Sequence, residues 1–347
     1  MKPMRLLTVA GAVLLATAPV GSVLAQSESH SYHLVKTVAL GSPDRWDYLT
    51  FDPQSHRLFV SHGDRVTVVD SNDGTIVGQV EGFPGGNHGI AISSATGRGY
   101  TDDGRAGTAT SFDLTTFAKG TAIKADADAD AVTFDPASGH IFVVDGDPGK
   151  VTVIDPKSDA AVATIDAGGK LEFAVTDGKG KLYVNGAEKK EIVRIDTRTN
   201  SVDARWPIAN CTSPHGLAID TSAHRLFSSC LNSLMVVVDT DNGSTVTSVP
   251  IGKGTDAAAF DPKRKRVFSS NGIDGTLSII QEKNPNTYSP LETLKTAVTA
   301  RTMAVDQSTG RLYLAAADVD SQAPPLPNGR PRVIAGSLKL LIFDPAP

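Results

Sequence analysis

The chain has 347 residues, 33 basic and 38 acidic side chains, a net charge of −5 and only two cysteines. An acidic balance argues against a broad electrostatic grip on nucleic acid, so no nucleic-acid partner is expected. The short basic run at 263–266 lies in a predicted tight turn, where a solvated group of charges is common, and it does not change this expectation.

The first 25 residues have the pattern of a secretory signal peptide. Lys2 and Arg5 give a positive start, an apolar run covers 6–15, and small residues precede a cleavage site before Gln26. A retained membrane helix is the alternative, but the apolar run is short and interrupted. The sequence therefore predicts a leader over 1–25 and a single mature domain over 26–347.

Removal of this leader would leave 31 basic and 38 acidic residues, a net charge of −7. No other stretch has the length and hydropathy of a membrane span. We therefore expect a monomeric protein in the periplasm or outside the cell, with no membrane span after cleavage of the leader.

One pattern recurs seven times along the rest of the chain: a polar residue, a short apolar stretch and a turn residue. The turn residues are 41, 42, 42, 43, 41 and 45 positions apart. A period near 40–45 built of short strands is typical of a β-propeller with one four-stranded blade per repeat. The segments are 47–52, 88–93, 130–135, 172–177, 215–220, 256–261 and 301–306.

The first repeat illustrates the predicted blade. Strands rich in Val, Ile, Thr, Phe and Tyr are expected over 48–51, 57–61, 65–70 and 75–80, with turn-forming residues between them. Later repeats follow the same plan, which predicts an all-β, seven-bladed propeller of four-stranded antiparallel blades.

The last repeat stops after its third strand, near the end of the chain. Because proteins avoid bare sheet edges, the segment 33–40 is expected to supply the missing outer strand. It is predicted to pair with the strand around 338–343, so that an N-terminal strand closes the ring in the last blade.

The polar residue that opens each repeat lies where the chain enters the inner strand of a blade. If the repeats superpose, these side chains form a ring at one mouth of the central tunnel, and we predict that this funnel ring binds a ligand. Carboxylates crowded in a narrow mouth repel one another, so a cation or a positively charged ligand is expected. The ring consists of Asp47, His88, Asp130, Glu172, His215, Asp256 and Arg301.

Antiparallel pairing predicts a second ring at the ends of the second strands, beside the first. Its polar members are His62, Asp103, Asp145 and Asn271. Imidazole and carboxylate groups from adjacent blades suit a divalent metal ion, which is the one cofactor that the sequence suggests. The candidate metal ligands are His62, His88, Asp47 and Asp130.

Other interpretations of the funnel stay open at this stage. The mouth could be a water-filled tunnel lining, a binding site for a small molecule or peptide, or a metal site. A histidine or a carboxylate with a raised pKa could also act as a base, although no catalytic residue is assigned. The chain has no HExxH, Gly-x-Ser-x-Gly or P-loop motif.

Two further features lie in the later repeats. Cys211 and Cys230 belong to the fifth repeat, and in an oxidising compartment we expect a disulfide, with free thiols or metal ligation as alternatives. The last repeat contains a long proline-rich connection over 318–335, which is predicted to open on the funnel face. Its Arg330 and Arg332 could reach over the acidic mouth; its role is otherwise left open.

The stretch 182–185, Leu-Tyr-Val-Asn, with the Ile-Val-Arg-Ile-Asp-Thr and Asn-Ser-Val that follow, resembles the YVTN repeat. The whole mature chain resembles the YncE-like, or YVTN-family, seven-bladed propellers of bacterial periplasms. This resemblance implies the fold and a secreted location, but no reaction. The Gly-His and Trp-Asp signatures of WD40 repeats do not occur at the corresponding positions.

The leading hypothesis is a secreted periplasmic propeller that binds a small molecule, metal or peptide at its polar funnel. One alternative is a metal-dependent hydrolase or lyase, similar to propeller lactonases, that uses the same ring. The other is a protein-interaction scaffold.

Overall fold

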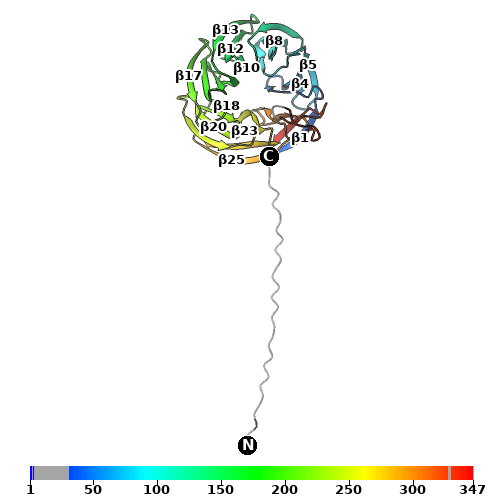
Figure 1. Ribbon diagram of the computed structural model, residues 1–347, viewed down its shortest axis with the longest axis vertical. Helices are drawn as coiled ribbons and strands as arrows, with labels where there is room; N and C mark the ends of the chain where they lie inside the picture. Colours follow the sequence, from blue (N-terminus) through cyan, green and yellow to red (C-terminus); the bar gives the residue numbers. More distant parts are fainter. Residues whose placement is uncertain (2, 4–30, 327–329, 347) are drawn as a thin grey trace.

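The computed structural model describes residues 1, 3, 31–326 and 330–346, which include seven four-stranded antiparallel sheets arranged in a ring (Figure 1). We number these sheets as blades 1 to 7 in chain order. The predicted all-β, seven-bladed propeller is confirmed. The predicted leader lies outside the described residues except for Met1 and Pro3. No helix in the described part of the chain is long and apolar enough to cross a membrane.

Each blade runs from an inner strand at the centre of the ring to an outer strand at its rim (Figure 1). The strands of blades 1 to 4 are β2 (Leu49–Asp52), β3 (Arg57–His62), β4 (Arg65–Asp70), β5 (Ile76–Glu81); β6 (Ile90–Ser93), β7 (Arg98–Asp103), β8 (Thr108–Asp113), β9 (Lys119–Lys124); β10 (Ala129–Asp135), β11 (His140–Asp145), β12 (Lys150–Asp155), β13 (Ala160–Asp166); β14 (Leu171–Thr176), β15 (Lys181–Gly186), β16 (Glu191–Asp196) and β17 (Ser201–Pro207).

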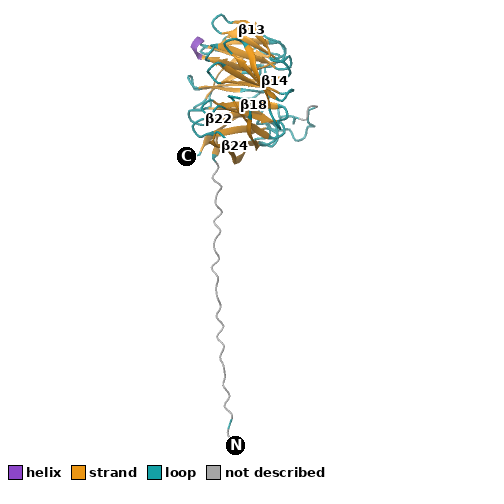
Figure 2. Ribbon diagram, turned by 90° about the vertical axis from the view of Figure 1, so that its left-hand side faces the viewer, coloured by secondary structure: helices purple, strands orange, loops and turns teal. Residues whose placement is uncertain are grey.

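The strands of blades 5 to 7 are β18 (Pro214–Asp220), β19 (Arg225–Cys230), β20 (Leu234–Asp239), β21 (Thr245–Pro250); β22 (Thr255–Asp261), β23 (Arg266–Asn271), β24 (Thr276–Asn284), β25 (Thr287–Lys295); β26 (Thr302–Val305), β27 (Leu312–Ala316), β28 (Lys339–Pro345) and β1 (Tyr32–Ala39). The edge-on view in Figure 2 shows the strands as a stack and, at one side, the short 3-10 turn η1 (Ser94–Thr96).

Burial follows the position of a strand within its blade. In β3, five consecutive residues are buried, because both faces of a central strand pack against neighbouring blades. The outer strand β17 instead alternates between exposed and half-buried residues. The β-branched and aromatic residues of the repeat therefore form one core layer between each pair of blades.

The ring is closed by β1, which pairs antiparallel with β28 from Tyr32 opposite Pro345 to Ala39 opposite Lys339. In Figure 1 the two segments lie side by side, although they come from opposite ends of the sequence. Tyr32 is fully buried, and its ring meets that of Phe268 in blade 6 edge to face, with centroids 5.5 Å apart. The predicted closure by an N-terminal strand is thus confirmed.

Six of the seven repeat motifs end in an aspartate that holds a turn together; the second motif ends in Ser93. The Asp52 carboxylate accepts hydrogen bonds from the Gln54 amide, at 3.1 Å, and the Ser55 hydroxyl, at 2.6 Å. Asp306 has the same arrangement in blade 7, where the Ser308 amide donates to its carboxylate at 2.8 Å. Such local bonds favour the turn over other conformations, and they explain why the repeat is readable in the sequence.

Two glycines allow neighbouring inner strands to approach closely. A Cβ atom on Gly89 would lie 2.3 Å from the backbone nitrogen of Val132 in the next blade. One on Gly216 would lie 2.4 Å from the backbone nitrogen of Ala258. The glycine after each funnel histidine is therefore required by backbone packing, and the histidine before it is free to face the tunnel.

Candidate functional site

The seven predicted funnel-ring residues converge at one mouth of the tunnel. Arg301 links blades 6, 7 and 1: its Nε lies 2.7 Å from the Asp256 carboxylate, and its terminal nitrogen lies 3.9 Å from that of Asp47. The same guanidinium donates to the Trp46 carbonyl at 2.6 Å. On the far side, the His215 Nε2 lies 4.0 Å from the Glu172 carboxylate. The ring therefore has the arrangement that the repeat predicts.

A β-bulge aims many of these side chains. In blade 3, Ala129 lies opposite Asp145 and Val132 opposite Val143, so the register shifts between them, where Asp130 lies. The same irregularity occurs at the ring positions of blades 4, 5 and 6. A bulge leaves a residue unpaired and redirects it, which turns these polar side chains out of the sheet and toward the mouth.

The ring carboxylates are held where their charge is unfavourable. Burial raises the pKa of Asp47, and Asp256 raises it further, against the lowering effect of Arg301. Burial and then repulsion from Asp47 raise the pKa of Asp130 well above its ordinary value. Burial also raises the pKa of Glu172, although His215 opposes this. Within the described residues, the Asp130 carboxylate has no hydrogen-bond or ion-pair partner.

His88 has a buried partner that the sequence analysis missed. Its Nδ1 lies 2.9 Å from the carboxylate of Asp102, whose side chain is completely buried. The backbone amides of His88 and Gly89 donate to the other Asp102 oxygen at 2.8 and 2.7 Å. These three hydrogen bonds to one carboxylate fix the backbone at His88 and Gly89, where the chain enters the inner strand, and the orientation of the imidazole.

Two neighbours act in opposite senses on the charge of His88. Burial lowers its pKa, but the hydrogen bond and charge of Asp102 outweigh this and raise it to about 9. Burial raises the pKa of Asp102 to about 6, against the effect of His88. Arg45, 3.1 Å from His88 Nε2, would favour an unprotonated nitrogen there. Since Arg45 is exposed and Asp102 is buried, Asp102 sets the charge, and the pair is ionic at neutral pH.

The predicted second ring is wrong as a ligand-facing layer. Its members are buried and bonded within the fold: His62 contacts the Thr67 hydroxyl at 2.8 Å, and the Thr152 hydroxyl donates to Asp145 at 2.8 Å. In blades 3 and 6 the bulge places Asp145 and Asn271 opposite the residue before the ring residue, and in blades 1 and 2 hydrogen bonds hold His62 and Asp103 within the fold. The members so corrected are His62, Asp103, Asp145 and Asn271.

The candidate metal set is also not brought together. Among the described residues, no group of three or more His, Cys, Asp or Glu side chains is placed to hold a metal ion. Both ring nitrogens of His62 are engaged, by Thr67 and by the Gly41 carbonyl at 3.1 Å. The set His62, His88, Asp47 and Asp130 is therefore corrected to a buried structural histidine and three ring residues.

On the second strand of several blades, the polar residue just before the predicted second-ring position holds the funnel ring in place. The Ser61 hydroxyl donates to the Asn87 carbonyl at 2.7 Å, and the Asn185 amide donates to the His215 carbonyl at 2.7 Å. The Ser270 hydroxyl donates to the Arg301 carbonyl. Each of these bonds crosses from one blade to the ring segment of the next, so the ring is positioned between blades.

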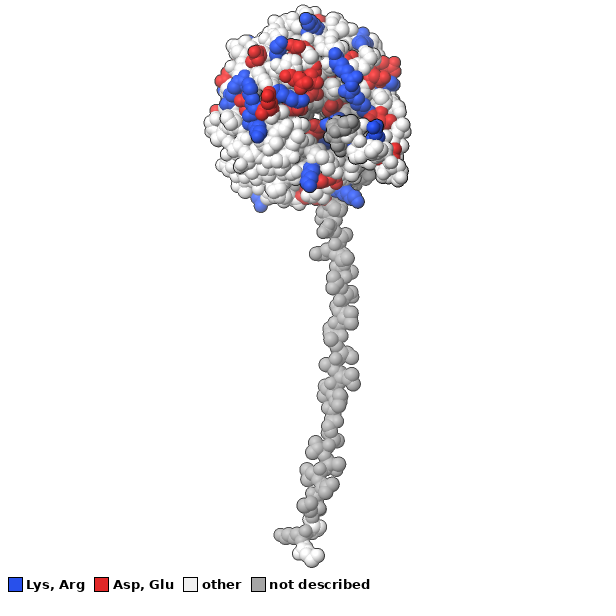
Figure 3. All heavy atoms as spheres, in the orientation of Figure 1, with Lys and Arg blue, Asp and Glu red and all other residues white. Residues whose placement is uncertain are grey.

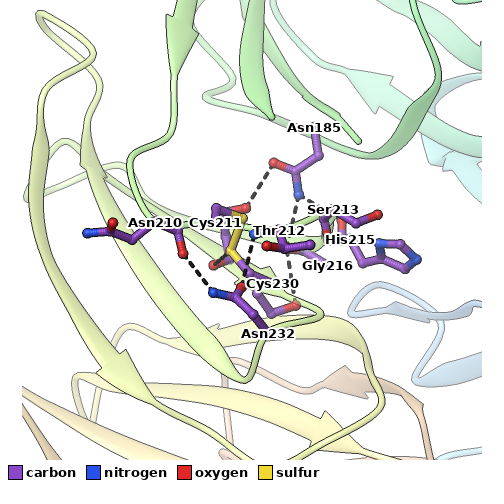
Figure 4. The surroundings of a disulfide bond; sticks show 11 residues. Asn185, Asn210, Cys211, Thr212, Ser213, His215, Gly216, Cys230 and Asn232 are labelled. Atoms are coloured by element: carbon purple, nitrogen blue, oxygen red, sulfur yellow. Dashed lines mark hydrogen bonds between the residues drawn. A yellow bond between two sulfur atoms is a disulfide. The ribbon is translucent and has the colours of Figure 1, made fainter. Parts of the chain in front are cut away.

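The cysteines predicted to pair, Cys211 and Cys230, are joined by a disulfide with Cα atoms 5.4 Å apart. Figure 4 shows the His215 imidazole projecting away from the sulfur atoms, while the Asn185 amide points to the backbone of His215 and Gly216. Asn232 reinforces this corner, because its amide donates to the Asn210 carbonyl at 2.8 Å. The entry of blade 5 into the ring is thus held by a covalent bond.

The long connection of blade 7 contributes a charge to the mouth. Arg330 lowers the pKa of Asp47, so its positive charge acts on the ring. The Arg332 Nε instead donates to the Pro324 carbonyl at 3.1 Å, within the same connection. Charged side chains gather over the upper blades of the face in Figure 3, and few lie at the lower left, where Figure 1 places β20.

Below the ring, Tyr48 and Phe173 form an aromatic floor, with ring centroids 4.8 Å apart. Burial raises the pKa of Tyr48 well above its usual range, and the negative charges of Asp130 and Asp47 raise it further. The fold and this site together define a seven-bladed β-propeller with a predominantly acidic funnel above an aromatic floor.

Comparison with known proteins supports the YncE-like resemblance. The chain is 27% identical over 187 residues to the "uncharacterized protein YncE" of Salmonella typhimurium strain LT2 and 26% identical to that of Salmonella typhi; each match covers 52% of both chains. The chain thus spans about half the length of the curated relatives it matches. No family model matches the chain.

A solved structure supports the fold independently. A chain of Kuenenia stuttgartiensis hydrazine synthase superposes with a TM-score of 0.67, covering 78% of this chain and 92% of that chain, at 14% identity. An identity this low carries the fold alone. The chain is therefore a seven-bladed β-propeller whose sequence is similar to that of YncE over about half of its length.

Proposed function

We propose that the funnel binds a small molecule or peptide through a positively charged amino group. The observation that carries this is the acid at the mouth: Asp130 has no direct hydrogen-bond or ion-pair partner among the described residues, and burial raises its pKa and that of Glu172. Arg301 is already engaged by Asp256 and Trp46. A ligand cation would supply the missing counter-charge and would be held strongly, because the site is partly shielded from water.

Isothermal titration with benzylamine, benzyl alcohol and benzoate tests this selectivity, since the three probes share a ring and differ in charge. We expect benzylamine to bind most tightly. The double substitution Asp130→Asn with Glu172→Gln should weaken benzylamine at least tenfold, the effect of losing about 1.4 kcal/mol. Equal binding of the amine and the alcohol would contradict the proposal.

A matched control removes the same charge elsewhere. Glu81 and Asp241 carry exposed carboxylates, which pair with the half-buried Arg65 at 3.7 Å and the exposed His224 at 2.7 Å, respectively. The double substitution Glu81→Gln with Asp241→Asn should leave benzylamine binding unchanged. If both double variants weaken the amine equally, the effect belongs to net charge, and the mouth is a solvated tunnel lining.

A second candidate function, hydrolase or lyase chemistry at the same mouth, is favoured by the pair of His88 and Asp102. A buried carboxylate that orients an imidazole is the arrangement used for proton transfer in catalysis. Turnover of a panel of lactones and aryl esters, measured for the wild type and for His88→Gln, tests it. Rates that His88→Gln does not lower would dismiss this candidate.

We also propose that the protein is exported. The predicted leader at 1–25 supports this, as does the disulfide of Cys211 and Cys230, which would persist in an oxidising compartment. N-terminal sequencing of protein from the periplasmic fraction should begin near Gln26. A chain that retains Met1 in that fraction would contradict cleavage at this site.

A further inference from the structure

A cavity of about 520 Å³ runs along the inner strands of blades 1 to 4, beneath the acidic mouth. Its upper end is lined by Tyr48 and Phe173, and its lower end by the exposed turn residues Pro53 and Gln54. Its volume lies within the range of sites that bind small molecules. We refer to this space as the central channel.

The wall of the central channel consists mainly of apolar side chains, and the polar residues Asp52, Gln54 and Ser94 lie at the end away from the mouth. Phe51, Ile92 and Phe134 project along it from three different blades. The hydroxyl of Thr50 donates to the Ile90 carbonyl at 2.8 Å, and that of Thr133 donates to the Ala174 carbonyl at 3.1 Å. Because both hydroxyls already donate to backbone carbonyls of the wall, they have no hydrogen left to donate to water in the channel.

Such a wall favours an apolar occupant. Water in a cavity needs several polar partners, and cavities lined by aliphatic and aromatic groups bind apolar molecules instead. The chemistry of the central channel is therefore opposite to that of the mouth, yet Tyr48 belongs to both. It lines the channel, and the negative charges of Asp130, Asp47 and Glu172 act on it from above.

We propose that the central channel holds the apolar body of an amphipathic amine whose charged end reaches the funnel ring. This inference deepens the proposed function and rests on it. Charge complementarity places the amine at Asp130 and Glu172, and the aromatic faces of Tyr48 and Phe173 suit the carbon atoms next to a cation. The ligand class is then a protonated amine with an alkyl or aryl tail.

Titration calorimetry with butylamine, hexylamine and octylamine tests the inference, with hexanol and hexanoate as matched probes. Each added CH2 should tighten binding about fourfold, which corresponds to about 0.8 kcal/mol per buried CH2. Hexylamine should bind more tightly than hexanol, and hexanoate should bind most weakly. Asp130→Asn with Glu172→Gln should weaken all three amines by the same factor and leave the chain-length slope unchanged.

Two substitutions probe the channel wall, each checked for an unchanged fold by circular dichroism and thermal melting. Ile92→Trp fills the channel, and Phe134→Ser makes its wall polar; both should reduce the chain-length slope without abolishing butylamine binding. The control is Phe117→Ser at the rim of blade 2, where the Phe117 side chain packs against Arg57. This variant should leave the dependence of affinity on chain length unchanged.

The possible results separate the two proposals. If the amines bind but their affinity does not depend on chain length, the channel inference is overturned and the proposed function stands. If hexanol binds as tightly as hexylamine and the ring variant has no effect, the proposed function fails, and the amphipathic-amine inference fails with it. Selectivity for the amine combined with a slope that Ile92→Trp removes supports both.

Discussion

The acidic mouth and the central channel are formed by the same inner strands, but opposite forces hold them. At the mouth, a few charge pairs such as Arg301 with Asp256 stabilise side chains whose burial is otherwise unfavourable. In the channel, Phe51 and Phe134 form part of an apolar wall, and the Thr50 hydroxyl donates a hydrogen bond to the backbone of the next blade. Adjacent residues on one strand can thus separate ligand recognition from core packing, because successive side chains of a strand point to different sides.

The largest effect on the mouth should come from Arg301→Met. The substitution leaves Asp47 and Asp256 without their counter-charge, and breaking this half-buried pair should cost up to about 3 kcal/mol of unfolding free energy. Urea denaturation measures it. The surface pair of half-buried Arg65 and exposed Asp64 provides the control, since Arg65→Met should cost less than about 1 kcal/mol. Equal losses would mean that the mouth is no more buried than the surface.

Loss of the disulfide should have a slightly smaller effect, confined to blade 5. The cysteines are 19 residues apart, so Cys211→Ala with Cys230→Ala should lower the unfolding free energy by about 3 kcal/mol or less through the entropy of the unfolded chain. Thermal melting of this variant and of the reduced wild type should agree. The dependence of amine affinity on chain length should not change in this variant. If it does, the structure of the mouth at His215 affects binding in the channel.

Asp102→Asn should change the protonation of His88 more than it changes stability. The pKa of His88 should fall from about 9 toward its ordinary value of about 6.5, as measured by NMR titration. Because the folded-state pKa of His88 is the raised one, the stability contributed by its protonation is fully present below about pH 6.5 and is lost as the pH rises through 9. The variant should therefore flatten the stability profile across that window.

The neighbouring residue offers a matched control for this experiment. Asp103 accepts the Gly85 amide at 3.3 Å and makes no hydrogen bond to His88 among the described residues. Asp103→Asn should leave the pKa of His88 near 9. If Asp103→Asn and Asp102→Asn shift it equally, the assignment of the buried partner is wrong.

The smallest expected effect is a gain in stability for Asp130→Asn, of about 1 kcal/mol at neutral pH. Burial raises the folded-state pKa of Asp130, so its contribution to stability is greatest when it is protonated and is lost as the pH rises through that pKa. The advantage of the variant should therefore shrink as the pH falls. Chemical denaturation at several pH values measures it, with Asp241→Asn expected to give no gain.

The sequence predicted the blades and the ring because the repeat is local. Turn carboxylates such as Asp52 and Asp306 bond within a few residues, so their spacing marks each blade directly. The ring followed from superposing the repeats. Asp102 was missed because Asp102 and Asp103 are both acidic, and only the register of the sheet distinguishes a buried partner of His88 from a second-ring residue.

The second ring and the metal set were wrong because several of their members are buried and bonded within the fold. A β-bulge at the inner strands of several blades adds a residue on one side of the pairing, and counting along the sequence does not reveal it. In blade 3 the shift accompanies the burial of Asp145, whereas His62 in blade 1 is buried and bonded to Thr67 and Gly41. The sequence analysis did not predict the channel, because the channel residues Phe134 and Ile92 are apolar like the residues of the core. Only their position in the structure shows that they line a cavity.

The sequence by itself determined the number of blades, the closing strand and which seven polar residues share one mouth, because these depend on period and on local turn chemistry. Only the tertiary structure decided which charges are compensated, which imidazole is held by a buried carboxylate and where an apolar channel lies below the ring. These properties depend on distances between side chains of different blades, such as the 2.7 Å between Arg301 and Asp256, and no spacing along the chain encodes them.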